Sequence, residues 1–264
     1  MTLMYFYSFF RFSDEEDSWL NNQLDHFDQV WHSVPLGEDH IREVIMFSYD
    51  VPTSKSFVRN GVSVFNERFK RIMLNHDCFS QLPQNVQSQI FQQNLFLGSA
   101  LLVAKLEYIQ SGSEQLFYAM GSFDRKQWKE ETRSLPHHAI KKFELYKENK
   151  FLQILSEEDC KQFQHLVNVI GETVKDDTML KLFTMVMLFK DNGINGTSEL
   201  KKLQESYINV IRRKQGSIYR DVGSYGTSLG VEIYSRFQSC IKDIQKLSLL
   251  LAKASQYNRL KVEK

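Results

Sequence analysis

Hydrophobic side chains recur at helical spacing along most of the chain. The first such stretch follows Ser13-Asp14-Glu15-Glu16, where the Ser13 hydroxyl and the Glu16 carboxylate can each accept a backbone amide of the other residue, as in a capping box. Apolar residues then follow at spacings of three and four residues, which places them on one face of a helix: Leu20, Leu24, Phe27 and Trp31. We therefore predict a helix that starts after Ser13 and stops before Pro35.

Later helices are predicted by the same periodicity and by capping residues. A long helix that ends near His76 carries an apolar stripe of Val58, Val62, Phe65, Phe69 and Ile72. One or two helices span residues 84–110. Side chains that favour helix starts precede the next periodic stretches, at Ser156, at Asp176 or Asp177, and at Thr197 or Ser198. Gly171 is expected to end the helix that starts at Ser156.

The segment from Leu95 to Ala104 is apolar on every face of its predicted helix. A helix without a polar face has to be enclosed by other elements, so the pattern predicts a layered helical domain around a buried central helix. The segment is too short to cross a bilayer, which takes about 20 apolar residues. No association with a membrane is therefore expected.

The last predicted helix carries an apolar seam. Its members, spaced by four and three residues, are Ile233, Phe237, Cys240, Ile244, Leu247 and Leu251. Such a seam is typical of a helix that packs along another helix, which belongs either to the same chain or to a second subunit. Before this helix we predict a Gly-rich loop at residues 216–230, and the best strand candidate is at residues 115–121.

The composition narrows the class of protein. The chain has 264 residues, 42% of them hydrophobic and 25% charged, which is typical of a globular protein and fits a single domain over residues 1–264. The low numbers of Gly (12) and Pro (4) disfavour an all-β sandwich, so we predict an all-α fold. A net charge of +1 does not favour a general nucleic-acid binder. The 20 Phe residues indicate either dense packing or a lined cavity.

The sequence offers little catalytic chemistry. Residues 226–230 match G-x-S-x-G, but no apolar strand precedes them and no histidine follows His165, so a hydrolase triad cannot be completed in chain order. The pair His137-His138 has no third metal ligand nearby. The three cysteines form no C-x-x-C pair and fit a reducing, intracellular compartment. We expect no enzymatic activity, no metal site and no cofactor.

A short run after the long helix that ends near His76 resembles a family signature. The matching residues, which are an aromatic residue, a leucine, a glutamine and two further apolar residues, are Phe79, Leu82, Gln87, Ile90 and Phe91. This pattern resembles the signature of nuclear receptor ligand-binding domains, with Gln92 in place of the usual lysine. The order of the remaining segments is similar to that of the vitamin D receptor and related invertebrate orphan receptors. The similar segments are the central helix at 95–104, a β-turn at 116–120, and later helices at 177–189, 203–207 and 241–247.

The resemblance implies a three-layer antiparallel α-helical sandwich that encloses a ligand cavity. The cavity would be lined by side chains from the third, fifth and tenth helices of the family and from its β-turn. In this chain these positions are Val62, Phe65, Phe69, Ile72, Leu101, Leu102, Tyr118, Met120 and Leu250. For each of them, plain core packing is the alternative. Many family members hold a polar ligand head with an arginine where this chain has Leu102, so the resemblance implies an apolar ligand.

The resemblance also implies an altered coactivator groove. Its positions in this chain are Lys70, Leu74, Ser88, Phe91 and Gln92. Leu74 stands where the family has the lysine of a charge clamp, and we expect the activation helix that carries the acidic partner to be absent. An LxxLL helix is captured by apolar anchors together with groups that cap its ends. The altered positions therefore imply little recruitment of coactivators.

The function implied by the resemblance is that of a ligand-binding domain in a nuclear-receptor-type transcription regulator, located in the nucleus or in both nucleus and cytoplasm. It would bind an apolar small molecule, or dimerise through the Ile233 seam with itself or with another receptor. The family's zinc-based DNA-binding domain needs more than three cysteines, so no direct contact with nucleic acid is expected. The alternatives are a ligand-independent interaction protein on the same scaffold that titrates receptor partners, and an unrelated helical scaffold without a cavity.

Overall fold

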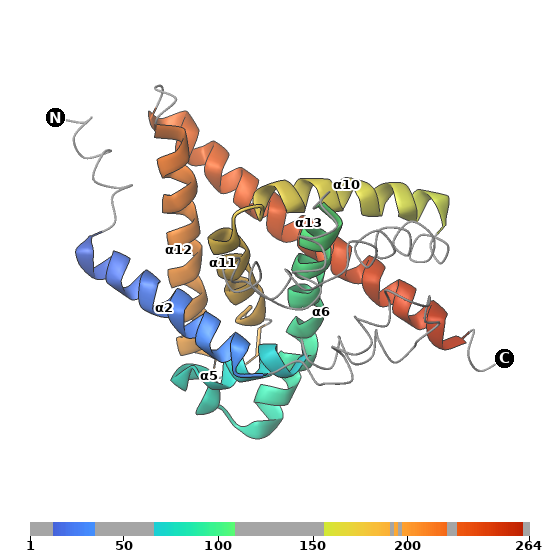
Figure 1. The fold of residues 1–264 in the computed structure, drawn as a ribbon, viewed down its shortest axis with the longest axis horizontal. Helices are drawn as coiled ribbons and strands as arrows, with labels where there is room; N and C mark the ends of the chain where they lie inside the picture. The colour runs from blue at the N-terminus through green and yellow to red at the C-terminus, as the bar shows by residue number, and fades with distance from the viewer. Residues whose placement is uncertain are drawn as a thin grey trace, which may run out of the picture.

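A computed structural model describes residues 13–34, 66–108, 156–190, 193–194, 197–220 and 226–260 (Figure 1). These residues are mostly helical and contain no strand, so the all-α prediction is confirmed for them. Residues 66–74 are helical as well. The remaining helices are α2 (Asp14–His32), α5 (Asp77–Ser80), α6 (Gln84–Tyr108), α10 (Glu157–Thr173), α11 (Asp177–Leu188), α12 (Ser198–Arg220) and α13 (Gly226–Leu260).

Side-chain caps start the helices where the sequence predicts them. The Ser13 backbone amide donates to Glu16 Oε2 at 3.0 Å and the Glu16 amide donates to Ser13 Oγ at 3.2 Å, which completes the capping box of α2. Ser156 accepts the Asp159 amide at the start of α10. Asp176 accepts two backbone amides at the start of α11, so it is the capping residue of the two candidates. Each such cap stabilises a helix by about 1 kcal/mol.

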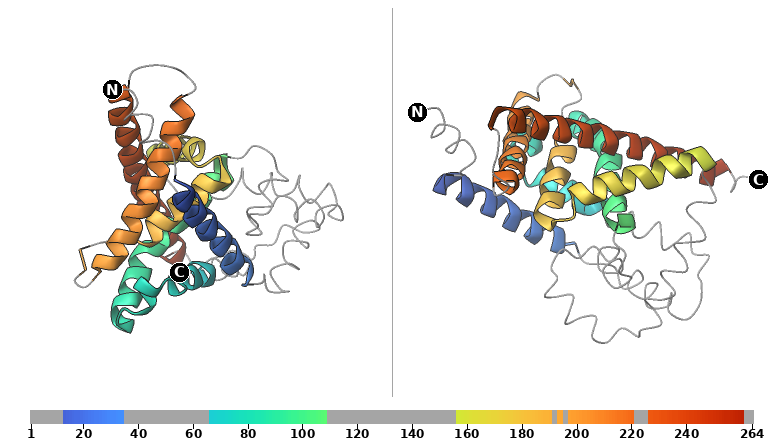
Figure 2. Two further views of the ribbon diagram at one scale, coloured as in Figure 1. Left: turned by 90° about the vertical axis from the view of Figure 1, so that its left-hand side faces the viewer. Right: turned by 90° about the horizontal axis from the view of Figure 1, so that it is seen from above.

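Helix α6 lies in the middle of the described helices. Helices α10, α11 and α13 all pack against it, and α10 also packs along α13 (Figures 1 and 2). Helix α12 packs on α11 and α13, and α2 contacts α11. Helix 66–74 reaches α6 through Phe69, whose ring lies against the backbone of Gly98. The central helix predicted from the sequence is therefore α6.

Helix α11 is enclosed more completely than α6. Every residue of α11 from Met179 to Leu188 is buried, including the polar Lys181 and Thr184. Burial of one large aliphatic side chain contributes roughly 1.5–3 kcal/mol, so the α6–α11 contact is a major source of stability. The Thr184 hydroxyl donates to the Leu180 carbonyl at 2.8 Å, which satisfies it inside its own helix.

Two buried polar side chains of α6 fasten the ends of its neighbours. Asn94 is fully buried and its Nδ2 donates to the Leu188 carbonyl at 2.8 Å and the Lys190 carbonyl at 3.0 Å, just after α11. Lys105 is also buried, and its Nζ donates to the Val174 carbonyl at 3.2 Å beyond the end of α10. The same ammonium lies 3.4 Å from the carboxylate of Asp177. These bonds satisfy carbonyls that a helix end leaves without internal partners.

Several predicted boundaries are wrong. Gly171 does not end α10, which continues to Thr173. The loop predicted for residues 216–230 is shorter at both ends, because α12 continues to Arg220 and α13 starts at Gly226. Glycine disfavours a helix by only about 1 kcal/mol, which packing against neighbouring helices outweighs. The short helix α5 was not predicted from the sequence. The strand candidate at 115–121 lies outside the described residues.

Gly171 allows α10 and α6 to approach closely. A Cβ atom at this position would overlap the Cβ of Tyr108 on α6, which cannot swing aside as the tip of a flexible side chain can. The same pair of helices is joined at this point by a hydrogen bond from the Tyr108 hydroxyl to the Glu172 carboxylate. A glycine is therefore required here by packing, in spite of its low helix propensity.

We predict that Gly171→Ala destabilises the protein by about 1–3 kcal/mol, because the steric overlap exceeds the gain in helix propensity. The measurement is the free energy of unfolding from urea denaturation. The control is Asn168→Ala, since Asn168 is exposed on the same helix. Equal stability of the two variants would show that α6 and α10 are not in close contact at Gly171.

Candidate functional site

The turn between α5 and α6 is held by Gln87. Its Nε2 donates to the Ser80 carbonyl at 2.9 Å and to the Leu82 carbonyl at 2.7 Å. Phe79 and Ile90, on either side of this turn, are buried in the core. Phe79 and Ile90 therefore anchor the turn, and Gln87 closes it.

The structure describes part of the group predicted to line a cavity. Phe69, Ile72, Leu101, Leu102 and Leu250 are all buried and belong to one continuous hydrophobic core. They come from helix 66–74, α6 and α13, so segments far apart in the sequence meet here. The other predicted positions, Val62, Phe65, Tyr118 and Met120, lie outside the described residues.

The interior around Phe69 is densely filled. A Cβ atom at Gly98 would lie 3.2 Å from two atoms of the Phe69 ring and 3.4 Å from Leu188 Cδ2. On another side, the Trp31 ring meets the Phe69 ring edge to face, with 5.6 Å between the ring centroids. Such contacts are at the density of a protein core. Phe69 therefore takes part in core packing between α2 and α6.

One face of α6 is less covered than the sequence predicts. Phe96 is 44% exposed, and Ser99 and Val103, which follow it at helical spacing, are only half-buried. The expectation that the segment 95–104 is enclosed on every face is wrong at Phe96. Because this segment has no polar side, its sequence gives no periodic signal that distinguishes the open face from the buried ones.

The residues predicted for a coactivator groove lie on helix 66–74 and the first half of α6. Lys70, Ser88 and Gln92 are exposed, Leu74 is 38% exposed, and Phe91 is half-buried against the core. The surface therefore offers two apolar side chains, Leu74 and Phe91, among polar ones. Its apolar area is smaller than that of a groove in which every anchor position is apolar.

The apolar seam of α13 is internal packing in the structure. Phe237, Cys240, Ile244 and Leu247 are buried within the single chain, and Leu251 is half-buried. The first four therefore leave almost no side-chain surface for a second subunit, while the side chain of Ile233 is not described. Burial raises the pKa of the Cys240 thiol to about 12, so this cysteine stays protonated and unreactive.

One buried arginine was not predicted from the sequence: Arg68 of helix 66–74, which lies against the end of α2. Arg68 is 3% exposed, and its Nε and Nη2 donate to the Val34 carbonyl at 3.2 and 3.0 Å. The guanidinium also lies 5.0 Å from the centre of the Trp31 ring, a favourable cation–π distance. Burial lowers the pKa of Arg68 to about 10, so it remains charged at neutral pH. A sequence signal existed, because Arg68 lies at helical spacing between Phe65 and Ile72 on the apolar stripe.

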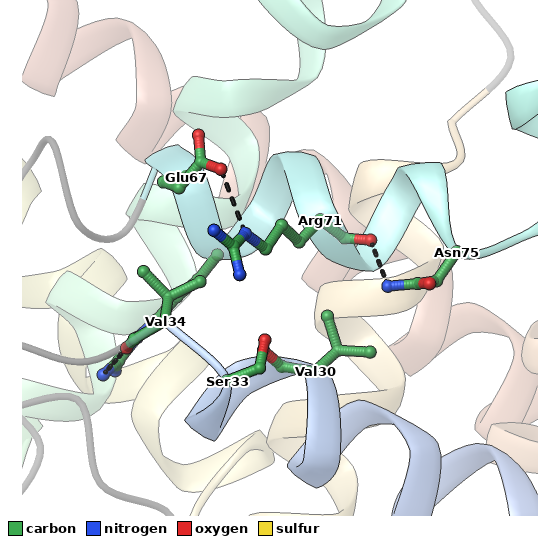
Figure 3. A network of polar contacts seen from close by, with 7 residues as sticks. Val30, Ser33, Val34, Glu67, Arg71 and Asn75 are labelled. Atoms are coloured by element: carbon green, nitrogen blue, oxygen red, sulfur yellow. Dashed lines mark hydrogen bonds and ion pairs between the residues drawn. The ribbon is translucent and has the colours of Figure 1, made fainter.

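Polar contacts surround the place where the end of α2 meets helix 66–74 (Figure 3). The Ser33 hydroxyl donates to the Val30 carbonyl at 2.7 Å and helps to end α2. On helix 66–74, Arg71 pairs with Glu67 at 3.1 Å, and Asn75 Nδ2 donates to the Arg71 carbonyl at 3.0 Å. Both ionic partners are about half exposed, so the pair contributes well below 1 kcal/mol. Together with the Arg68–Val34 hydrogen bonds, these contacts form a structural connection between α2 and helix 66–74.

Polar pairs also tie α2 to α11 and α12. Lys181 on α11 lies 2.6 Å from Asp28, and the Tyr207 hydroxyl on α12 donates to Gln23 Oε1 at 2.6 Å. Arg213 on α12 pairs with Glu16, whose pKa is lowered by its hydrogen bonds to the Ser13 backbone and to Arg213. These contacts orient α2 across the surface of α11 and α12.

The described residues were also searched for metal sites and membrane spans. Among them, no three His, Cys, Asp or Glu side chains gather closely enough to hold a metal ion. None of the helices within the described ranges combines the length and the hydropathy that crossing a bilayer requires.

Comparison of the chain with protein-family models, with curated proteins and with solved structures gave no match.

We predict that Gln87→Ala destabilises the protein by about 1–3 kcal/mol, because two carbonyls in the α5–α6 turn lose their donor. The measurement is the free energy of unfolding in urea, combined with hydrogen exchange of residues 79–83. The control is Gln89→Ala, since Gln89 is exposed two residues further along α6. A Gln87→Ala variant as stable as the control would contradict the role of Gln87.

Proposed function

We propose that the chain is a divergent ligand-binding domain of the nuclear receptor type. The observation that carries this proposal is the role of Gln87, because it connects a sequence pattern to a specific contact. The glutamine of the signature donates to the Ser80 and Leu82 carbonyls, and the signature's apolar members Phe79 and Ile90 are buried around the turn. A chance match to the signature would not require these residues to form one structural unit.

The packing order of the helices supports the same proposal. Helix α2 and helix 66–74 lie on one side, joined by the contacts of Arg68 with Val34 and Trp31. Helices α6 and α11 come next, and α10 with α13 packs on α6. This order fits the three-layer antiparallel sandwich of the proposed family. Because one fold serves many functions, the arrangement supports the architecture more strongly than the activity.

The proposed ligand is an apolar small molecule. The described candidates Ile72, Leu101, Leu102 and Leu250 offer it only hydrocarbon surface, and the same is true of Phe96 on the open face of α6. Pockets for small molecules are mostly apolar with few polar groups that fix orientation. The domain would act in transcriptional regulation in the nucleus, alone or as a dimer with itself or another receptor, without contacting DNA directly.

Dimerisation, in this proposal, uses the outward face of α13. The buried seam is taken up by internal contacts, whereas Leu249 on the same helix is 70% exposed. Exposed Ser239, Lys242 and Lys246 lie on its side of the helix at spacings of three and four residues. A partner helix that packs there would cover Leu249 within a polar rim, as is usual at protein interfaces.

A second candidate function is supported by the packing of Phe69. Its ring fills the space between Gly98 and Trp31, and a domain filled in this way throughout would need no ligand. It would then act as a ligand-independent interaction protein that titrates receptor partners. The two candidates differ in whether the purified chain carries a small molecule.

We predict that denaturing extraction of the purified chain followed by mass spectrometry releases a bound apolar compound. Val103→Trp should reduce the recovered amount severalfold, because the added indole occupies space beside the half-buried face of α6. The control is Gln89→Trp, which adds the same side chain at an exposed position of α6. Recovery of no compound from the wild-type chain would support the ligand-independent function.

A further inference from the structure

His76 lies at a junction of aromatic rings from several elements. It precedes α5, where it occupies the N-cap position, and its ring meets three others edge to face. The ring centroids are 4.8 Å from Phe189 at the end of α11, 5.9 Å from His26 on α2 and 6.5 Å from Tyr207 on α12. We call His26, His76, Phe189 and Tyr207 the His76 junction.

One face of α2 is fixed at this junction. Trp19, Gln23 and His26 follow one another at spacings of four and three residues, which puts them on one side of the helix. The Trp19 ring packs against Tyr207 at 5.3 Å, and Gln23 accepts the Tyr207 hydroxyl. His26 then contacts His76. The junction is therefore a main point of attachment for α2.

One ring nitrogen of His76 has no partner among the described residues that would stabilise a positive charge by hydrogen bonding. This atom, Nε2, is buried without a hydrogen-bond partner. The Tyr207 hydroxyl donates a hydrogen bond to Gln23 Oε1 and is not a hydrogen-bond partner of the imidazole. A buried polar atom without a partner costs roughly 1–3 kcal/mol even when it is neutral, and a buried charge costs more.

The ionisable groups around the junction act in opposite directions on His76. A positive charge on His26 disfavours protonation of His76, whereas Asp77 on α5 favours it, and burial, the largest effect, disfavours it. Cys78 on α5 faces Tyr207 and Glu199, and both Cys78 and Tyr207 have raised pKa values because they are buried, so they stay neutral. Lys190 follows Phe189, and burial lowers its pKa.

We propose that the His76 junction is an acid-sensitive latch: a proton on His76 breaks the ring contacts and loosens α2 against α5, α11 and α12, while the remaining helices stay packed. A proton on the buried Nε2 needs a hydrogen-bond partner such as water, and opening of the junction supplies one. Helix α2 is also held by two ion pairs that do not involve His76, Glu16 with Arg213 on α12 and Asp28 with Lys181 on α11. This inference does not depend on the proposed ligand.

The direction of the pH effect follows from the pKa. Burial lowers the pKa of His76 to about 4, against 6.5 for an exposed histidine. Above pH 6.5 the imidazole is neutral whether α2 is attached or released, so the latch is fully closed. As the pH falls from 6.5 towards 4, the released state binds the proton and the attached state does not, so attachment weakens throughout this range.

The test is hydrogen exchange of the full chain at pH 7 and pH 5, corrected for the intrinsic exchange rate. In the wild type, protection of α2 amides should fall roughly ten- to thirtyfold, the factor given by pKa values of about 4 and 6.5, while α11 changes less than twofold. His76→Phe keeps a ring but cannot bind a proton, so the protection of α2 amides should fall less than twofold between pH 7 and pH 5. In His26→Gln the protection of α2 amides should fall less than in the wild type, because no positive charge at residue 26 then opposes protonation of His76.

Three outcomes would overturn the latch, and the third concerns the titration of His76 itself. One is an α2 in His76→Phe that loses protection at pH 5 as much as the wild type does. Another is a parallel loss in α2 and α11, which means global unfolding. If His76→Phe does not fold, His76→Gln serves the same comparison. In the wild type, the NMR titration of the His76 ring has to coincide with the loss of α2 protection, and a titration near pH 6.5 without release of α2 would also refute the proposal.

Discussion

The enclosure of α6 is the constraint on which the rest of the structure depends. Exposure of its apolar side chains to water is unfavourable, and neighbouring helices cover most of them, with Phe96 as the main exception. Asn94 and Lys105 then decide how two of these neighbours are placed, because each donates hydrogen bonds to carbonyls just beyond the end of α11 or α10. Hydrophobic burial drives the association, and these directional bonds select one arrangement.

The same arrangement sets what the domain can do. With α10, α11 and α13 packed on α6, the interior formed by the described residues is mostly hydrocarbon, and its polar contacts between helices lie largely at helix ends and where α2 is attached. Such an interior suits an apolar ligand or a filled core. The attachment of α2 through Tyr207, His76 and Arg68 differs, because buried polar and aromatic groups hold it.

Much of the fold could be predicted because its signals are local. Caps at Ser13, Ser156 and Asp176 depend on a few adjacent residues, and they lie where the sequence places them. The buried stripe with Phe69 and Ile72 follows from spacing alone. The assignment of a family by the signature at residues 79–91 remains a proposal, which the contacts of Gln87 support.

The remaining features could not be predicted because they depend on distant contacts. Phe96 is exposed although its neighbours in sequence are equally apolar, since the coverage of each face is set by other helices. Helix α10 continues through Gly171, and the reason for a glycine there lies far away in the sequence, because Tyr108 occupies the space that a Cβ would need. The sequence of the α13 seam around Phe237 does not decide whether its partner helix belongs to the same chain or to a second subunit. Only the packed structure assigns its side chains to the interior.

Native-state hydrogen exchange of wild-type protein and a Lys105→Met variant tests the role of α6 most directly. In the wild type, amides of residues 94–105 should exchange only through global unfolding and be among the slowest in the chain. Lys105→Met should speed exchange most at the C-terminal end of α10, where the Val174 carbonyl loses its donor. Faster exchange in α6 than in α10 and α11 of the wild type would contradict a central, enclosed α6.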